Sequence, residues 1–313
     1  MNSIYSIISS QSKLVFGQVW TENQNTEIAN GYTAMIPINI GKDVILFAYN
    51  KNAQKTDTFR LTNSAPWVSK VDSQIDLSDG QWDSLNTFVL GNNNYLMTYQ
   101  KDNGVFGFYQ ITDDLQSSKP FKFSNSRETP TTGFTTIVPL TSLDQQYFLG
   151  YDFDLGKVAS FSLMVKTSSW NSPPLRAQNI WYHQWSPGWT HFAFFKLGET
   201  NFFFKINKKR LNVNIDHILD DPANGGIPIG THLEKKLPNA DSISNVVMIP
   251  WENGEPYLLT YINTSGSAIV YKINADCKGF VNIGESITQK NVSMIIPYCI
   301  GNKTFTLFYG GQT

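Results

Sequence analysis

The feature that most constrains this chain is a pattern that occurs six times, at intervals of about fifty residues. Each copy reads as an apolar strand, a turn and a second apolar strand, and five of the six copies end in tyrosine. The copies are GYTAMIPINIGKDVILFAY (31–49), QWDSLNTFVLGNNNYLMTY (81–99), GFTTIVPLTSLDQQYFLGY (133–151), GWTHFAFFKLGETNFFFKI (188–206), SNVVMIPWENGEPYLLTY (244–261) and NVSMIIPYCIGNKTFTLFY (291–309). Turns rich in Asn, Asp or Gly follow the second strand, and helical periodicity is absent. Each copy therefore predicts one antiparallel sheet built from hairpins.

The two ends of the chain supply the strands that the sixth copy lacks. The segment NSIYSI (2–7) matches the third-strand segment SAIVYKI (267–273), and Lys13 to Trp20 reads as a further strand. A pattern that is periodic only on a circle predicts a closed ring, because closure covers the sheet edges of an open array. We therefore predict an all-β fold, a six-bladed β-propeller of four-stranded antiparallel blades whose N-terminal strands complete the last blade.

This ring would form a single domain over residues 1–313, with the last blade closed by residues 1–20 together with 291–313. A pair of β-sandwiches is the structural alternative. A seventh blade would require a seventh copy of the pattern, which the sequence does not contain.

Charge and composition narrow the classes of partner. Charged residues make up only 16% of the 313 residues, the net charge is −1, and no basic run exceeds Lys208-Lys209-Arg210. A nucleic-acid binder needs a sustained basic surface, so we expect no nucleic-acid partner. Aromatic residues make up 14%, and a surface rich in Asn, Ser, Thr and Tyr suits a neutral, hydroxyl-rich glycan or another small-molecule ligand. The oligomeric state is left open.

The sequence contains no apolar run as long as the roughly 18 residues of a membrane span and no classical signal peptide at Met1. We therefore expect a soluble protein, either cytoplasmic or released without a classical signal. The two cysteines, Cys277 and Cys299, are too few for a zinc site or a disulfide framework. One bridge between them is possible, but two free thiols are favoured, and we expect no metal and no cofactor.

The fourth copy carries the most legible motif, Trp185-Ser186-Pro187-Gly188-Trp189-Thr190-His191-Phe192. This motif resembles the Trp-x-x-Gly-Trp-Thr-His-Phe repeats of the tachylectin and tectonin type of β-propeller lectin. The periodic pattern covers nearly the whole chain, whereas the specific motif is clear in this copy alone. The resemblance implies a propeller fold and carbohydrate binding.

The densest cluster of aromatic and imidazole side chains surrounds this motif. It comprises Trp181, His183, Trp185, Trp189 and His191. Flat aromatic faces suit the C–H faces of sugars, while neighbouring polar groups can bind hydroxyls. We predict Trp181, His183, Trp185, Trp189 and Thr190 as the ligand-binding site. The alternative for each tryptophan is packing between neighbouring blades.

His191 and Asp83 define a second hypothesis. The first strand of a propeller blade lines the central channel, and His191 is the one imidazole at its position among the six copies, while Asp83 occupies a position held elsewhere by Thr33, Thr135, Thr190 and Ser293. If both side chains point inward, they could act as an acid and base pair. The alternatives are a hydrogen-bonded structural histidine and a carboxylate that caps a turn.

Two functions follow, in order of preference. The first is a lectin-like carbohydrate-binding propeller. The second is an enzyme of the cyclase, lyase or hydrolase type, with one asymmetric pocket in the central channel for a hydrophobic small molecule, since the copies differ in chemistry. A protein-interaction scaffold is a third reading that suits any propeller.

Overall fold

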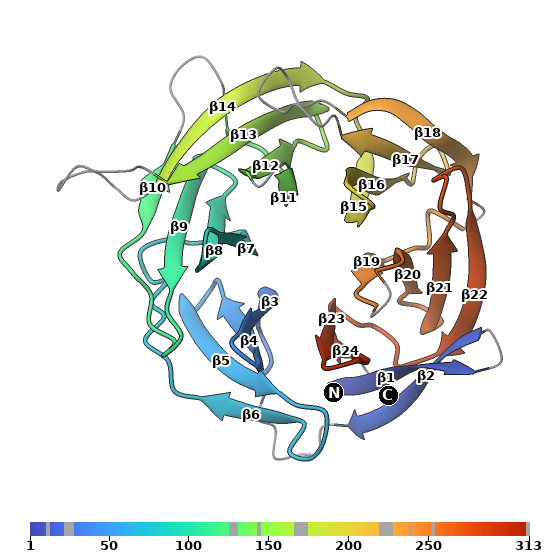
Figure 1. Cartoon of the computed structure of the whole chain (residues 1–313), viewed down its shortest axis with the longest axis horizontal. Coiled ribbons are helices and arrows are strands. Elements are labelled where there is room, and N and C mark those ends of the chain that lie inside the picture. Colours follow the sequence, from blue (N-terminus) through green and yellow to red (C-terminus); the bar gives the residue numbers. More distant parts are fainter. Residues whose placement is uncertain are drawn as a thin grey trace.

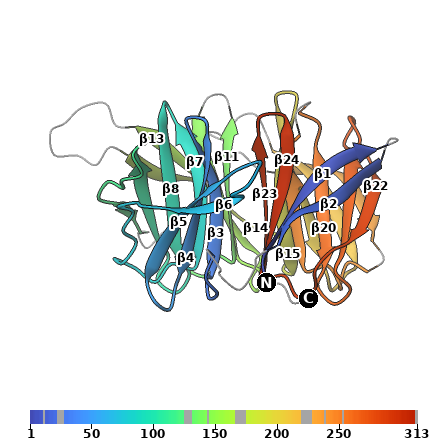
Figure 2. The same ribbon diagram turned by 90° about the horizontal axis from the view of Figure 1, so that it is seen from below.

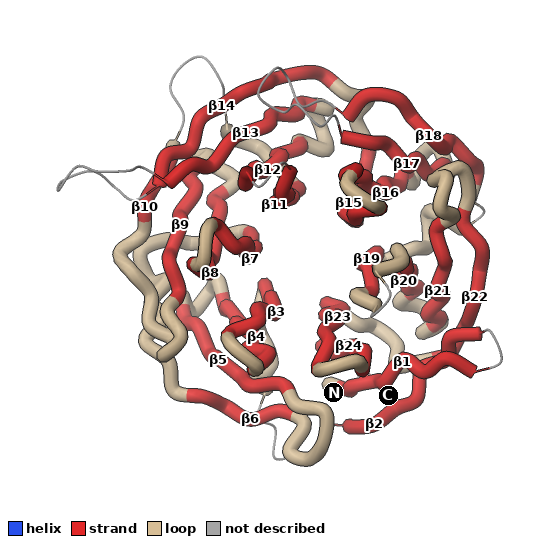
Figure 3. The backbone as a smooth tube through the Cα atoms, in the orientation of Figure 1, coloured by secondary structure: helices blue, strands red, loops and turns tan. Residues whose placement is uncertain are grey.

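The computed structural model describes residues 1–10, 13–21, 28–124, 131–142, 145–165, 175–218, 228–237, 239–251 and 254–310. Strands and loops make up this part of the chain, and no helix occurs in it (Figure 3). Twenty-four strands form six four-stranded antiparallel sheets arranged in a ring (Figure 1). The predicted six-bladed β-propeller is confirmed.

The blades are numbered from β3 onward, and their strands are given in chain order. Blade 1 contains β3 (Ala34–Ile40), β4 (Asp43–Asn50), β5 (Lys55–Leu61) and β6 (Val68–Val71). Blade 2 contains β7 (Ser84–Leu90), β8 (Asn93–Gln100), β9 (Val105–Ile111) and β10 (Phe121–Phe123). Blade 3 contains β11 (Thr136–Ser142), β12 (Gln145–Tyr151), β13 (Lys157–Val165) and β14 (Leu175–Gln184).

The second half of the ring follows the same order. Blade 4 contains β15 (Trp189–Leu197), β16 (Thr200–Asn207), β17 (Asn212–Ile218) and β18 (Pro228–Lys236). Blade 5 contains β19 (Asn245–Ile249), β20 (Tyr257–Ile262), β21 (Ser267–Ile273) and β22 (Phe280–Ile287). Blade 6 contains β23 (Met294–Ile300) and β24 (Lys303–Tyr309), followed in the sheet by β1 (Ser3–Ser10) and β2 (Lys13–Thr21).

Blade 6 closes the ring as the sequence predicts. Strand β1 pairs antiparallel with β24, with Ile4 opposite Leu307, and β2 forms the outer edge of the sheet (Figure 2). The backbone N–H of Gly310 donates to Asn2 Oδ1 at 2.9 Å. Segments from the two ends of the chain therefore share one sheet.

The hydrophobic core lies mainly between blades. The second strand of each blade is largely buried, as in β4, where Val44 to Tyr49 are all buried. Successive side chains of a strand point to opposite faces of its sheet, so an uninterrupted apolar run packs against both neighbouring blades. This explains the apolar runs in the middle of the second strands, such as Val44 to Phe47 in β4.

Cys277 and Cys299 are both free thiols in the structure. Burial raises the pKa of Cys277 to about 11. Among the described residues, no helix is long and apolar enough to cross a membrane. No group of three or more His, Cys, Asp or Glu side chains is placed to hold a metal ion in this same part of the chain.

Candidate functional site

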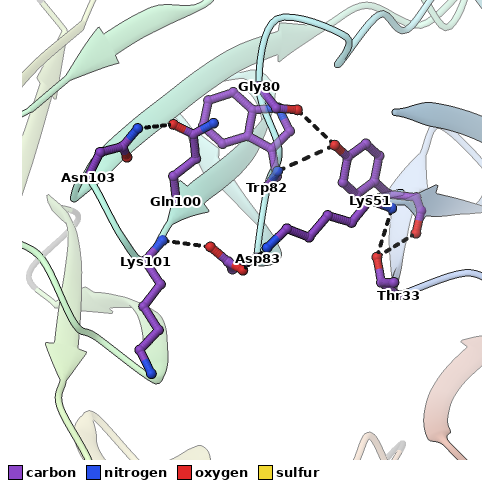
Figure 4. Close-up of polar contacts among 9 residues, drawn as sticks. Thr33, Lys51, Gly80, Trp82, Asp83, Gln100, Lys101 and Asn103 are labelled. Carbon is purple, nitrogen blue, oxygen red and sulfur yellow. Dashed lines mark hydrogen bonds and ion pairs between the residues drawn. The ribbon is translucent and has the colours of Figure 1, made fainter. Parts of the chain in front are cut away.

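In most blades, a tyrosine at the end of the second strand forms a hydrogen bond with the backbone that leads into the next blade. The hydroxyl of Tyr49 donates to Gly80 O at 2.8 Å and accepts from the N–H of Trp82 at 3.3 Å (Figure 4). The same residue position donates to a backbone carbonyl of the following blade at Tyr99, Tyr151, Tyr261 and Tyr309. Burial raises the pKa of Tyr49, Tyr99, Tyr151 and Tyr261, so these phenols remain donors at neutral pH. Blade 4 has Ile206 at this position.

His191 makes a contact across the junction that lacks the tyrosine. Its Nε2 lies 3.0 Å from Ser244 O in blade 5, and its Nδ1 lies 2.8 Å from Thr190 Oγ1. Burial lowers the pKa of His191 from its ordinary value of 6.5, and the nearby charge of Lys208 lowers it as well. The neutral imidazole is therefore favoured, with the N–H on Nε2 donating to Ser244 O. Both ring nitrogens already have partners within the fold.

Asp83 occupies the same structural position as Thr33 (Figure 4). Thr33 Oγ1 accepts from the N–H of Lys51 at 3.1 Å, and Asp83 Oδ2 accepts from the N–H of Lys101 at 2.7 Å. The other carboxylate oxygen of Asp83 forms an ion pair with Lys51 Nζ. Asp83 lies in blade 2 and His191 in blade 4, each with its own partners, so the structure does not bring the two predicted catalytic residues together.

Trp185 and Trp189 line the junction between blades 3 and 4. Trp189 is buried, and Trp185 is half-buried with its ring stacked on Phe203 at a centroid separation of 5.7 Å. The loop beneath Trp185 approaches closely because it contains Gly156, which has φ +70°; a Cβ there would lie 2.3 Å from Trp185 O. The N–H of Trp185 in turn donates to Gly156 O at 2.8 Å.

Between these two rings lies a lysine that the sequence analysis did not single out. Lys205 Nζ is 4.3 Å from the ring centroid of Trp189 and 4.6 Å from that of Trp185, and it forms an ion pair with Asp216. The side chains of Lys205 and Asp216 are only 8% and 6% exposed. Burial lowers the pKa of Lys205, while Asp216 opposes this shift. A charged residue within the apolar run Phe202-Phe203-Phe204 to Ile206 is the signal that could have revealed it.

The face of blade 4 toward blade 3 carries further buried polar side chains. Asn201 and Lys205 alternate with Phe203 on β16, and Asp216 lies opposite Phe203 on β17. Three buried side-chain oxygens have no hydrogen-bond partner among the described residues: Asn201 Oδ1, Asn212 Oδ1 and Asp216 Oδ1. Buried polar atoms are nearly always paired, so this junction has unused capacity to accept hydrogen bonds.

Trp181 and His183 form the outer rim of the same junction. Both lie on β14, the outermost strand of blade 3, with ring centroids 5.3 Å apart. Trp181 packs against the same hydrophobic cluster as Trp185 and Trp189. His183 is exposed, and the intervening Tyr182 is 43% exposed. Together, Trp181, His183 and Trp185 form what we call the rim aromatic surface.

The five residues predicted to bind a ligand are therefore brought to one region, but in two layers. Trp181, His183 and Trp185 belong to the rim aromatic surface, whereas Trp189 lies below it in the core. Thr190 Oγ1 lies 2.8 Å from His191 Nδ1, to which its hydroxyl donates when the imidazole carries its proton on Nε2, and 3.3 Å from Ile206 O. Thr190 therefore orients His191 within blade 4.

The innermost strands, which surround the central channel, are poor in charge. The segments β3, β7, β11, β15, β19 and β23 contain no Asp or Glu, and Lys196 is their one lysine. A cavity of about 330 Å³ at this level is lined by residues including Thr87, Pro139 and Phe194. His191 and Asp83 are not among the residues that line this cavity.

No protein-family model matches the chain, and no curated protein matches it in sequence. Solved structures share the propeller fold. One from Bacteroides fragilis, named as a candidate 6-phosphogluconolactonase, has a TM-score of 0.54 at 15% identity, over 94% of this chain and 84% of its own. An exo-β-1,3-galactanase from Phanerochaete chrysosporium, solved with galactose, has a TM-score of 0.52 at 9% identity, over 91% of this chain and 72% of its own. A protein from Lactobacillus plantarum has a TM-score of 0.54 at 12% identity, over 94% and 84%. At these identities the likeness shows the fold alone.

Proposed function

We propose that this chain is a carbohydrate-binding propeller that holds a neutral, hydroxyl-rich glycan against the rim aromatic surface without cleaving it. The observation that carries the proposal is the gathering of Trp181, His183 and Trp185 at one blade junction, with half-buried indole rings next to an exposed imidazole. Indole faces bind the C–H faces of sugar rings, and imidazole and amide groups bind their hydroxyls. The resemblance of the Trp185–Phe192 motif to the tachylectin and tectonin lectins supports the same ligand class.

The chemistry of the channel favours binding over hydrolysis. Most glycoside hydrolases use two carboxyl groups that flank the scissile bond. The six innermost strands supply none. Asp83 caps a turn and pairs with Lys51, and both nitrogens of His191 are engaged within the fold. An enzyme built on these two residues would first have to break those contacts.

The test is a broad glycan array followed by titration calorimetry on the best ligand. Trp181→Ala and His183→Ala should each weaken binding, by about tenfold for the indole, while Val281→Ala, a change at an exposed apolar residue of blade 5, should leave it unchanged. Trp189→Ala is not a useful variant, because Trp189 packs against Lys205 in the core. An array on which the wild type binds nothing would overturn the proposal.

A further inference from the structure

A second candidate binding site lies at the blade that closes the ring. A cavity of about 440 Å³ is flanked by Trp67 from blade 1 and Trp251 from blade 5, with β1 and β24 of blade 6 between them. Its volume lies within the range of about 300–1,000 Å³ that is usual for small-molecule sites. The rim aromatic surface contributes no residue to it.

The two indole rings are held in place by neighbouring aromatic side chains. The Trp67 ring packs edge-on against Phe305 at 5.9 Å, and the Trp251 ring contacts Tyr257 at 5.4 Å. Both tryptophans are half-buried, so one part of each ring stays accessible. Ile8, which is 50% exposed, adds an apolar side chain to the same cavity. Large exposed apolar groups inside a cavity mark places where a ligand can bury them.

The polar lining consists of groups that bind hydroxyls and anions. Asn63 and Asn302 contribute carboxamides, Ser6 and Ser9 contribute hydroxyls, and Lys303 contributes the one charge. None of the residues lining the cavity is Asp or Glu. Lys303 forms no ion pair with the described residues. The cavity thus has aromatic faces, amide and hydroxyl groups, and a single positive charge without a counter-ion.

We propose that this cavity binds an acidic saccharide unit, with the apolar face of its ring against Trp251 and its carboxylate toward Lys303. An acidic sugar offers apolar C–H faces for the indoles, hydroxyls for the amides, and one negative charge for the ammonium group. The inference rests on the proposed function only for the saccharide class of the ligand. Its location and its preference for an anion are independent of the rim aromatic surface.

The cavity is lined by strands from distant parts of the chain, and this has a measurable consequence. Residues from β1 and β2 meet residues from β24 in this cavity, so it exists only when the ring is closed. A ligand that binds the folded state alone raises the free energy of unfolding by an amount that grows with the logarithm of its concentration above the dissociation constant. Glucuronate should therefore raise the melting temperature, and the rise should depend on this cavity.

The experiment uses the full chain with glucuronate and glucose as probes, read by ligand-detected NMR and by thermal unfolding. Ile8→Glu places a carboxylate at an exposed position in the cavity without removing buried packing, and it should abolish the glucuronate signal. Trp251→Ala should weaken binding of both sugars by about tenfold. Lys303→Gln should weaken glucuronate by about two- to fivefold, as expected for an exposed ion pair, and leave glucose unchanged.

Trp181→Ala serves as the reciprocal control and should leave glucuronate binding intact. If glucuronate binding survives Ile8→Glu and Trp251→Ala but is lost in Trp181→Ala, this inference is wrong while the proposed function stands. If glucuronate binding responds to Ile8→Glu while array binding ignores Trp181→Ala, the inference stands and the rim site is wrong. Equal affinity for glucose and glucuronate would overturn the role of Lys303.

Discussion

Blade 3 packs against a neighbouring blade on each side, but one of these junctions is apolar and the other contains buried charges. Between blades 2 and 3 the contact is made by aromatic rings: Phe148 and Phe161 stack at 4.7 Å within blade 3, and Phe106 of blade 2 lies 4.8 Å from Phe148. Between blades 3 and 4 the corresponding layer holds the Lys205–Asp216 ion pair under Trp185 and Trp189. The first junction is stabilised by apolar burial, while the second must offset the desolvation of two charges. A propeller therefore tolerates a polar junction, and a polar junction is where a ligand site is most readily built.

Removing one charge from the polar junction between blades 3 and 4 should change the free energy of unfolding more than any other substitution. Lys205→Met leaves Asp216 buried without its partner and should lower the free energy of unfolding by about 3–5 kcal/mol. The double variant Lys205→Met/Asp216→Leu, which makes this junction resemble its apolar neighbour, should recover most of that loss. Urea unfolding measures both.

Lys196→Met is the control for this pair of variants, because Lys196 and its partner Glu199 are exposed in the same blade. It should change the free energy of unfolding by less than about 0.5 kcal/mol. A double variant no more stable than Lys205→Met would contradict the idea that the cost comes from an uncompensated charge.

Breaking the tyrosine contact at the apolar junction should have the next largest effect. The Tyr99 hydroxyl donates to Thr131 O at 2.6 Å and accepts from the N–H of Phe134 at 3.0 Å, and both contacts are buried. Tyr99→Phe leaves two buried backbone groups unpaired and should cost about 1–3 kcal/mol. Tyr95→Phe, in the same strand, is the control, because the Tyr95 hydroxyl has no hydrogen bond among the described residues; equal losses in the two variants would argue against the contact.

The junction between blades 4 and 5, where His191 replaces the tyrosine contact, should respond to pH. Because burial lowers the pKa of His191 in the folded state, the unfolded chain takes up a proton at higher pH than the folded chain. The free energy of unfolding should therefore fall as pH drops through 6.5, and the loss should continue down to the folded pKa. His191→Gln keeps a donor for Ser244 O and removes the titration, so its stability should depend less on pH over this range. Parallel curves of unfolding free energy against pH would show that His191 does not titrate there.

The smallest change in the free energy of unfolding is expected at the junction of blades 1 and 2. Asp83→Thr installs the residue found at the equivalent position of blade 1 and loses only an exposed ion pair with Lys51. Exposed ion pairs contribute little, so the change in the free energy of unfolding should stay within about 0.5 kcal/mol. A much larger loss, measured by thermal or urea unfolding, would show that Asp83 has a role beyond turn capping.

The fold could be predicted from the sequence because the blade pattern is local and repeated. The alternation of apolar runs and turns, with Pro37, Pro139, Pro250 and Pro297 at matching places, defines strands and hairpins without knowledge of distant contacts. The tyrosines at 49, 99, 151, 261 and 309 were visible as repeat markers. Their hydrogen bonds were not, since each reaches a carbonyl in a different blade.

The candidate site could be predicted only in part, because many of its contacts also join residues of different blades. Clustering in sequence located Trp181, His183 and Trp185, which lie on β14 and the loop after it. Lys205 and Asp216 stayed hidden, because a lone charge in a strand ordinarily indicates a solvent-facing position. The partner of His191, Ser244, lies 53 positions away and is set by the packing of one blade against the next.

The pairing of β1 with β24 has a consequence for the order in which the molecule can fold during synthesis. Asn2 and Gly310, which are hydrogen-bonded, are 308 positions apart, so the hairpin β1–β2 leaves the ribosome long before its partner strands exist. A lone two-stranded hairpin is marginally stable in water, and the open edge of β1 exposes groups that could pair with another chain. Blades 1 to 5 can assemble as they emerge, but blade 6 must wait for the last strands. The ring can therefore close only after β23 and β24 have been made.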